Sequence, residues 1–336
     1  MNLVKRKQMC ARSGLVYTTL ISVGTLIKQS VLGPSCKVMS EIREEHRVTH
    51  GGLPDWTKSG ENFFFVETSG ISCLTSRQAC SIESAARTNR GSTVFLLTVR
   101  ELEQCSYMDH LRTLPNFKYL KIDVGSVVNG TPLDFWYTSS FWTASPFQTE
   151  HFSDALRLLI LWKYGGAYAD LDVMVLKDMA GLTSSLCREL FPMVGNGVMR
   201  FQKEHPFLAS CLVEFARAYT PQLFAHNGPR LLERTLDRLC PKKPVMHTPY
   251  FNVCSGVTVL PHEAFYPVPY TEWRTLFQAS SASHVLRLVS KSYTLHLWNS
   301  QSKSTYMEPG SAYDALMKSF CPVVYALSTA HNPDAL

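Results

Sequence analysis

The sequence predicts an α/β fold with a mainly parallel central sheet, preceded by an N-terminal membrane anchor. Three observations support this prediction. Strand-like and helix-like segments alternate between residues 62 and 122, which is typical of a parallel sheet covered by helices. The chain has 336 residues and is 45% hydrophobic, enough to bury one large core. A basic N-terminus precedes a run without charged residues.

Charge is concentrated at the start of the chain. The formal net charge is +6, and residues 1–47 carry eight Lys or Arg side chains against three acidic ones. The remaining sequence is therefore close to neutral. A protein that binds phosphate backbones needs an excess of basic side chains on its folded surface, so we expect no nucleic-acid partner.

The N-terminal segment has two interpretations. Lys5, Arg6, Lys7 and Arg12 precede the uncharged run 14–27, which Lys28 closes. Such a run suits the core of a cleaved signal peptide. It also suits a short signal anchor over residues 14–32, because a thin secretory membrane needs only about 18 residues and flanking basic side chains can snorkel. The anchor interpretation makes residues 1–13 a cytosolic tail and places the rest of the chain in the lumen.

Residues 33–60 are polar and contain Gly33-Pro34 and Gly51-Gly52-Leu53-Pro54, which predicts an extended stem. A luminal chain with ten cysteines is expected to form disulfides, but the sequence leaves their pairing open. Asn129-Gly130-Thr131 is an acceptor triplet for N-glycosylation, consistent with passage through the secretory pathway.

The first elements of the predicted domain follow β-α-β order. Asn62–Val66 is an apolar run too short for a helix, so we expect a buried strand. Residues 76–88 predict a helix, and residues 93–99 and 118–122 predict two further strands. Ligands of parallel sheets bind beyond the carboxyl ends of the strands. Glu67, Thr68 and Ser69 would lie there.

Residues 153–164 predict a buried helix. Ser153 is a favourable N-cap, the segment that follows is almost entirely apolar, and Gly165-Gly166 supplies a left-handed stop. Asp154 and Arg157 lie on one side of this helix. Charged groups at buried positions must be paired or face a polar cavity.

Residues 167–176 predict a strand whose alternation directs Asp170 and Asp172 to the same side. An isolated Asp-x-Asp pair is usually a solvated acidic turn. Here apolar residues flank the pair on both sides, and two carboxylates close together in a buried sheet repel each other. A bound Mn²⁺ or Mg²⁺ would stabilise them, since both ions prefer oxygen ligands and could bridge a nucleotide-sugar diphosphate.

These residues form part of a longer motif. Ser153-Asp154-x-x-Arg157, Trp162-Lys163-Tyr164-Gly165-Gly166-x-Tyr168 and Asp170-x-Asp172 together resemble the α1,4-glycosyltransferases. The resemblance extends from about residue 62 to residue 322. Its other segments, in order, are 65–69, 80–87, 131–137, 228–229, 265–267, 293–299 and 321–322.

The resemblance implies a GT-A catalytic domain over residues 61–325, in a single-pass type II protein of the Golgi membrane. It also implies a metal-dependent enzyme that transfers a sugar from a UDP-sugar with retention of configuration. Catalysis would then depend on Asp170, Asp172 and Arg157. Asp154 and Arg157 would bind the donor sugar or diphosphate, and residues 67–69 would line the nucleotide pocket.

Other roles follow from the same resemblance. His296 would complete the metal shell with Asp170 and Asp172, or would simply pack on a strand over residues 293–298. Asn196 and Asn227 would present amides to the donor sugar, although both also suit ordinary turns. Trp298 would join the donor-binding residues.

The resemblance favours α1,4-transfer of galactose from UDP-galactose to a terminal sugar of a glycosphingolipid. An N-acetylhexosamine donor, or a glycoprotein acceptor, is the alternative. An inactive relative that binds glycans belongs to another class, and the intact Asp170 and Asp172 argue against it. The aromatic cluster of Trp136, Tyr137, Phe141 and Trp142 suits core packing or contact with the acceptor.

Overall fold

The computed structural model describes residues 61–189, 193–240 and 251–331, all of which belong to one compact unit. The predicted tail, anchor and stem over residues 1–60 lie outside the described residues. Within the described ranges, no helix has both the length and the apolar character that crossing a bilayer requires.

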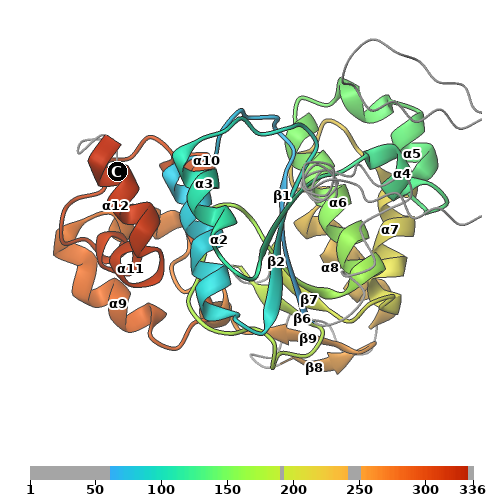
Figure 1. Ribbon diagram of the computed structural model, residues 1–336. Helices are drawn as coiled ribbons and strands as arrows, with labels where there is room; N and C mark the ends of the chain where they lie inside the picture. The colour runs from blue at the N-terminus through green and yellow to red at the C-terminus, as the bar shows by residue number, and fades with distance from the viewer. Residues whose placement is uncertain (1–60, 190–192, 241–250, 332–336) are drawn as a thin grey trace, which may run out of the picture. The chain divides into compact units, whose positions relative to one another are not determined.

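The described part is built on an eight-stranded sheet (Figure 1). The strand order is β3-β2-β1-β4-β7-β6-β9-β8, and four of its seven pairings are parallel, which confirms the mainly parallel sheet. The strand bounds are β1 Glu61–Glu67, β2 Ser92–Thr98, β3 Phe117–Lys121, β4 Gly166–Ala169, β6 Ser185–Arg188, β7 Val194–Phe201, β8 Phe251–Cys254 and β9 Val257–Leu260.

Helices cover both faces of this sheet, so its central strands are apolar on both sides. In β1, Phe63 and Phe65 pack into one core while Phe64 and Val66 pack into the other. The first core is closed by α2 Ser76–Thr88, α3 Ser106–Arg112, α9 Ala282–Val289, α11 Ala312–Phe320 and α12 Pro322–His331 (Figure 1). The second is closed by α4 Val124–Val128, α5 Asp134–Thr138, α6 Gln148–Tyr164, α7 Pro206–Ala218 and α8 Pro229–Leu239.

Short elements connect these layers. They are the 3₁₀ helices η2 Phe141–Ala144, η3 His262–Ala264, η4 Tyr270–Leu276 and η5 Ala279–Ser281, together with the helix α10 Asn299–Ser302.

The predicted strand over residues 167–176 is wrong as a single element. Strand β4 ends at Ala169, residues 170–172 form a turn, and β5 Val173–Val175 pairs antiparallel with β10 Thr294–His296 in a separate two-stranded sheet. The turn is closed by the Val173 amide, which donates to the Asp170 carbonyl at 3.0 Å. The two aspartates therefore lie on a turn between two sheets.

Helix α6 begins at Gln148, five residues before the predicted start, so the prediction of Ser153 as N-cap is wrong. Its end agrees with the sequence prediction. Gly165 and Gly166 have φ angles of 67° and 112°, and a Cβ on Gly165 would lie 2.6 Å from the Lys203 backbone nitrogen. Glycine is required here for both conformation and space.

Three disulfides join the described cysteines: Cys73–Cys105, Cys80–Cys321 and Cys240–Cys254. Cys80–Cys321 connects helix α2 to the start of α12, across 241 residues of sequence. The expected formation of disulfides is therefore confirmed for these six cysteines.

Candidate active site

Asp170, Asp172 and His296 converge where the two sheets meet. One potential ligand atom from each lies within 4.8 Å of the others. Asp170 follows β4, and Asp172 precedes β5. His296 reaches the same place because it pairs with Val173 in the β5–β10 register. The predicted convergence of the two carboxylates is thus present, although a turn produces it.

Arg157 on α6 holds Asp170 in place. Its guanidinium contacts the two Asp170 oxygens at 3.2 and 3.0 Å and donates to the Asn196 carbonyl at 3.0 Å. It also donates to the Ser153 carbonyl and hydroxyl at 3.2 and 2.8 Å. Burial lowers the Arg157 pKa, but the nearby Asp170, Tyr168 and Asp154 outweigh it and raise that pKa. Four hydrogen bonds and the ion pair with Asp170 therefore hold the guanidinium within the protein, so Arg157 orients Asp170.

Tyr168 completes the support of Asp170. Its hydroxyl donates to Asp170 Oδ1 at 2.7 Å, and the Arg157 guanidinium carbon lies 4.8 Å from the centre of its ring. Burial and the Asp170 charge raise the Tyr168 pKa, although Arg157 opposes them, so the phenol remains a hydrogen-bond donor. Asp170 is therefore fixed in direction before any ligand arrives.

Asp154 forms a second polar position beside this cluster. Its Oδ1 accepts a hydrogen bond from the Asn196 amide at 2.6 Å and lies 3.6 Å from Arg157. Burial raises the Asp154 pKa, while Arg157 and Asn196 lower it less strongly. The other oxygen faces Gly228, where a Cβ would come within 2.6 Å. Asp154, Asn196 and Gly228 therefore line one small polar recess.

Space for a cation exists at the aspartate pair. A Cβ on Gly197 would lie 2.8 Å from Asp170 Oδ2 and 3.2 Å from His296 Nε2. The absence of a side chain at this point leaves the carboxylate edge open. Two carboxylates and an imidazole are a suitable donor set for Mn²⁺, and the carboxylates also suit Mg²⁺. The residues present therefore fit a divalent cation.

His296 is held by its neighbours. Its Nδ1 accepts a hydrogen bond from the Trp298 amide at 3.0 Å, and the two rings lie 4.1 Å apart. A neutral imidazole in this arrangement carries its proton on Nε2, which lies 3.6 Å from Asp172. Ligation through Nε2 would require the other neutral tautomer, with the proton on Nδ1 and without the hydrogen bond from the Trp298 amide. Trp298 positions His296, while its own indole donates to the Val268 carbonyl.

The other predicted donor-binding residues have different surroundings. Glu67 accepts hydrogen bonds from the amides of Ser69 at 2.7 Å and Gly70 at 2.9 Å, so it stabilises the loop after β1. Thr68 donates to the Thr149 carbonyl of α6 at 3.0 Å. These contacts place residues 67–69 at the carboxyl edge of the sheet, as predicted.

Asn227 is not brought to the carboxylate cluster. It is 1% exposed, and its amide accepts from the Thr220 N–H at 3.0 Å and donates to the Thr220 carbonyl at 2.9 Å. Its Nδ2 also lies 3.2 Å from His151 Nε2. The oxygen and the nitrogen of the amide both have hydrogen-bond partners. Asn227 therefore stabilises the loop that places Gly228 next to Asp154.

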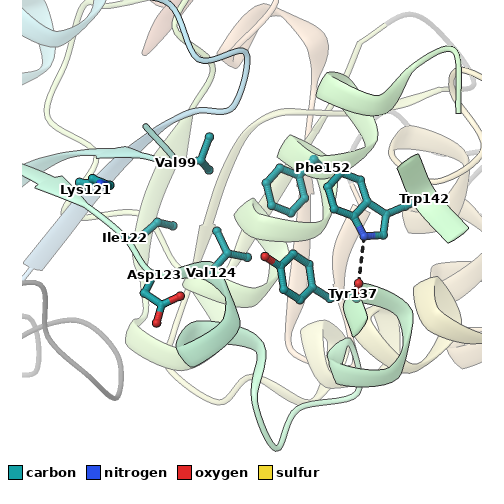
Figure 2. A pocket seen from close by; sticks show the side chains of 8 residues that line it. All are labelled: Val99, Lys121, Ile122, Asp123, Val124, Tyr137, Trp142 and Phe152. Atoms are coloured by element: carbon teal, nitrogen blue, oxygen red, sulfur yellow. Dashed lines mark hydrogen bonds between the residues drawn. The ribbon is translucent and has the colours of Figure 1, made fainter. Parts of the chain in front are cut away.

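A pocket of about 430 Å³ opens beyond the ends of β2 and β3 (Figure 2). The amide of Val99, one of its lining residues, donates to the Glu67 carbonyl at 3.3 Å. The rings of Tyr137, Trp142 and Phe152 are nearly parallel, with interplanar angles of 13°, 13° and 5°. Phe152 belongs to α6, the helix that also carries Asp154 and Arg157. The lining residues are Val99, Lys121, Ile122, Asp123, Val124, Tyr137, Trp142 and Phe152.

Glu189 was missed by the sequence analysis because no motif surrounds it. Burial raises its pKa; the nearby His296 opposes this effect, whereas Asp170 adds to it. Glu189 therefore lies within electrostatic reach of the aspartate pair. Tyr168 and Gly197 were also given no role, although Tyr168 stands inside the recognised motif.

Comparison with known proteins agrees with this geometry. Residues 75–191 match the model of a glycosyltransferase sugar-binding region containing a DXD motif, and residues 200–328 match an α1,4-glycosyltransferase conserved region. The chain is 33% identical over 273 residues to the mouse lactosylceramide 4-alpha-galactosyltransferase, covering 79% of this chain and 75% of that protein. The human protein of that name is 32% identical over 285 residues, covering 82% and 78%.

Human alpha-1,4-N-acetylglucosaminyltransferase is 27% identical over 320 residues, covering 91% of each chain. A solved galactosyltransferase, LgtC in complex with donor and acceptor sugar analogs, aligns with 77% of this chain and 96% of its own at 12% identity, with a TM-score of 0.41.

The DXD motif, its family model and the relatives that are more than 30% identical to this chain define a hexosyltransferase. Within that class, the chain belongs to the α1,4-glycosyltransferase family.

Proposed function

We propose that this protein is a retaining GT-A enzyme that transfers galactose from UDP-galactose, in α1,4 linkage, to a terminal sugar of a glycosphingolipid. The observation that carries the proposal is the Asp170–Asp172 pair, held next to the Asp154 recess with open space at Gly197. The names of the most similar relatives support the donor and the glycolipid acceptor.

In this proposal Asp170 and Asp172 would hold Mn²⁺ or Mg²⁺, and His296 would join them through Nε2 as the neutral tautomer that carries its proton on Nδ1. The cation, when bound, neutralises the negative charge that develops on the departing diphosphate. Arg157 and Tyr168 act as positioning residues, because both bind the Asp170 carboxylate directly. The free Asp154 oxygen accepts a hydroxyl of the donor sugar, with Asn196 fixing its direction.

We assign the aromatic pocket to the uracil base of the donor. The parallel rings of Tyr137, Trp142 and Phe152 suit a flat ring, and Asp123 offers an acceptor for its N–H group. Burial, together with the nearby Asp123 charge, raises the Tyr137 pKa, so its hydroxyl also remains a donor. Residues 67–69 then border the nucleotide from the β1 side.

The proposed setting is the Golgi lumen, with residues 14–32 as a type II anchor. The three disulfides support an oxidising compartment. An N-acetylhexosamine donor is the second candidate, because one relative is an alpha-1,4-N-acetylglucosaminyltransferase with high coverage of both chains.

One experiment tests both candidates. The full chain in detergent is incubated with Mn²⁺, lactosylceramide and, in turn, UDP-galactose, UDP-N-acetylglucosamine or UDP-N-acetylgalactosamine. We expect product only with UDP-galactose, with loss of turnover on removal of the metal and in Asp170→Asn. Product formed only with another UDP-sugar would show that galactose is not the donor sugar. Full turnover in Asp170→Asn would reject the assignment of the active site to this carboxylate.

A further inference from the structure

Two segments without charged residues lie side by side next to the Asp154 recess. The fifteen residues 135–149 and the seven residues 219–225 contain no Asp, Glu, Lys, Arg or His, although 18% of the whole chain is Asp, Glu, Lys or Arg. The first segment includes most of α5 and all of η2, and leads into α6. The second follows α7 and leads to Gly228.

Direct contacts join the two segments. The Phe141 and Tyr219 ring centroids lie 6.3 Å apart, and those of Phe147 and Phe224 lie 5.3 Å apart. The Ser145 hydroxyl donates to the Pro221 carbonyl at 2.7 Å. The segments therefore form one continuous surface.

This surface exposes large apolar side chains. We call it the apolar rim, and its exposed members are Phe135 (83%), Phe141 (58%), Leu223 (54%) and Phe224 (55%). Single exposed apolar residues are common, but four of them on two adjoining uncharged segments are not expected on a surface that faces only water. Exposed Phe and Leu side chains that gather on one surface are typical of proteins that rest on the boundary between membrane and water.

We propose that the apolar rim rests on the lipid bilayer that carries the acceptor, with its phenylalanines inserted at the interface. The absence of Lys and Arg from both segments argues for contact with neutral lipid rather than attraction to anionic headgroups. This inference rests on the proposed function for the choice of a lipid-linked acceptor.

The apolar rim lies close to the proposed donor site. One segment runs into the helix that carries Asp154, and the other runs into Gly228, which faces Asp154 Oδ2. The Tyr137 and Trp142 side chains line the pocket, and Phe135 and Phe141 of the same segment are exposed. A bilayer seated on the rim would bring a lipid-linked sugar close to the donor recess, where only the sugar needs to leave the membrane surface.

A direct test uses the full chain reconstituted into phosphatidylcholine vesicles with or without bromine on the acyl chains. The variant Phe141→Trp places a reporter on the rim. Tyr306→Trp is the matched control, because Tyr306 is 51% exposed and belongs to neither segment. We expect bromolipid to quench the added emission of Phe141→Trp, at low and at high salt, and to leave that of Tyr306→Trp unchanged. Equal emission of Phe141→Trp in both kinds of vesicle would overturn the proposal, as would self-association of the chain that protects it from quenching.

A second test measures function. The triple variant Phe135→Ser, Leu223→Ser, Phe224→Ser should lose at least about tenfold in kcat/KM for lactosylceramide in vesicles, equivalent to about 1.4 kcal/mol. The same variant should keep its kcat/KM for a water-soluble lactoside within about twofold. Equal losses on both acceptors would reject the membrane contact. If the proposed donor or acceptor is wrong, the kcat/KM comparison will give no product with wild type. The quenching of Phe141→Trp does not depend on either substrate, so it still tests the membrane contact.

Discussion

A single methyl group at Gly197 should weaken the metal site without removing any ligand. In Gly197→Ala the new Cβ would lie 2.8 Å from Asp170 Oδ2, whereas ordinary contacts begin near 3.4 Å. The carboxylate oxygen would therefore have to move by about 0.6 Å. Metal–ligand distances tolerate only about 0.2 Å, so this displacement exceeds what coordination permits.

The carboxylate cannot escape easily. Arg157 and Tyr168 hold both Asp170 oxygens through contacts of 2.7–3.2 Å, and the Asp170 amide donates to the Gly197 carbonyl at 2.8 Å. We therefore expect Gly197→Ala to weaken Mn²⁺ binding by about 10- to 100-fold, the usual effect of misplacing a ligand. At saturating Mn²⁺, part of the lost turnover should return.

The assay is titration calorimetry of Mn²⁺ in the presence of UDP, with thermal unfolding to show that the variant remains folded. Gly91→Ala is the control, since nothing lies within 4 Å of a Cβ at that position. Mn²⁺ affinity in Gly197→Ala within about twofold of wild type would refute the assignment of the cation to this edge of Asp170.

Three further predictions concern stability. Because burial raises the Asp154 pKa, its ionised form opposes folding, and Asp154→Asn should raise Tm at pH 7 while abolishing turnover. Burial raises the pKa of Asp314, but hydrogen bonds led by that of Lys318 at 2.7 Å outweigh it and lower this pKa. Asp314→Asn should therefore lower Tm at pH 7, and the difference should vanish as the pH falls below about 4, through the folded-state pKa. Replacing both Cys80 and Cys321 with serine should destabilise the fold by about 3–5 kcal/mol in denaturant unfolding, because their bond closes a 241-residue separation.

The elements that could be predicted from the sequence are those with strong local signals. Helix α2 spans Ser76–Thr88 as predicted, because Thr75 and Gln78 form a capping box at its start. Strand β1 also agrees, since four consecutive large apolar residues suit a strand covered on both faces. In these places local chemistry and tertiary packing favour the same structure.

Predictions failed where tertiary contacts override local preference. Helix α6 starts at Gln148 because His151 is held by Ser145, Tyr219 and Asn227, which lie outside the helix, so its first turns are buried. Ser153 then serves Arg157 inside the helix instead of capping it. The spacing of apolar residues along the sequence does not indicate such tertiary contacts. The pairing of cysteines was open for the same reason.

The site residues show the same division. The motif identified Asp170, Asp172, Asp154 and Arg157 as one group, and the structure brings all four together. Their individual roles depend on which hydrogen-bonding atoms remain unused. Only the structure reveals that Arg157 binds Asp170, Asn196 and Ser153, and that within the described part of the chain Asp154 accepts a hydrogen bond from Asn196 through Oδ1 while Oδ2 faces Gly228.

The balance of charge at this site explains why a cation belongs there. Asp154 and Asp170 share the guanidinium of Arg157, Asp172 lies within electrostatic reach of Arg77, and Glu189 lies within reach of Asp170, so four carboxylates face two guanidinium groups. Neutral donors such as Tyr168 and the Asn299 amide, which contacts Asp172 at 2.8 Å, stabilise these groups but do not cancel their charge. Partly buried anions that are not neutralised repel each other and lose hydration. A divalent cation removes that repulsion on arrival. The same excess negative charge would repel a nucleotide diphosphate from the cation-free site, so the charge balance favours binding of the metal before, or together with, the donor.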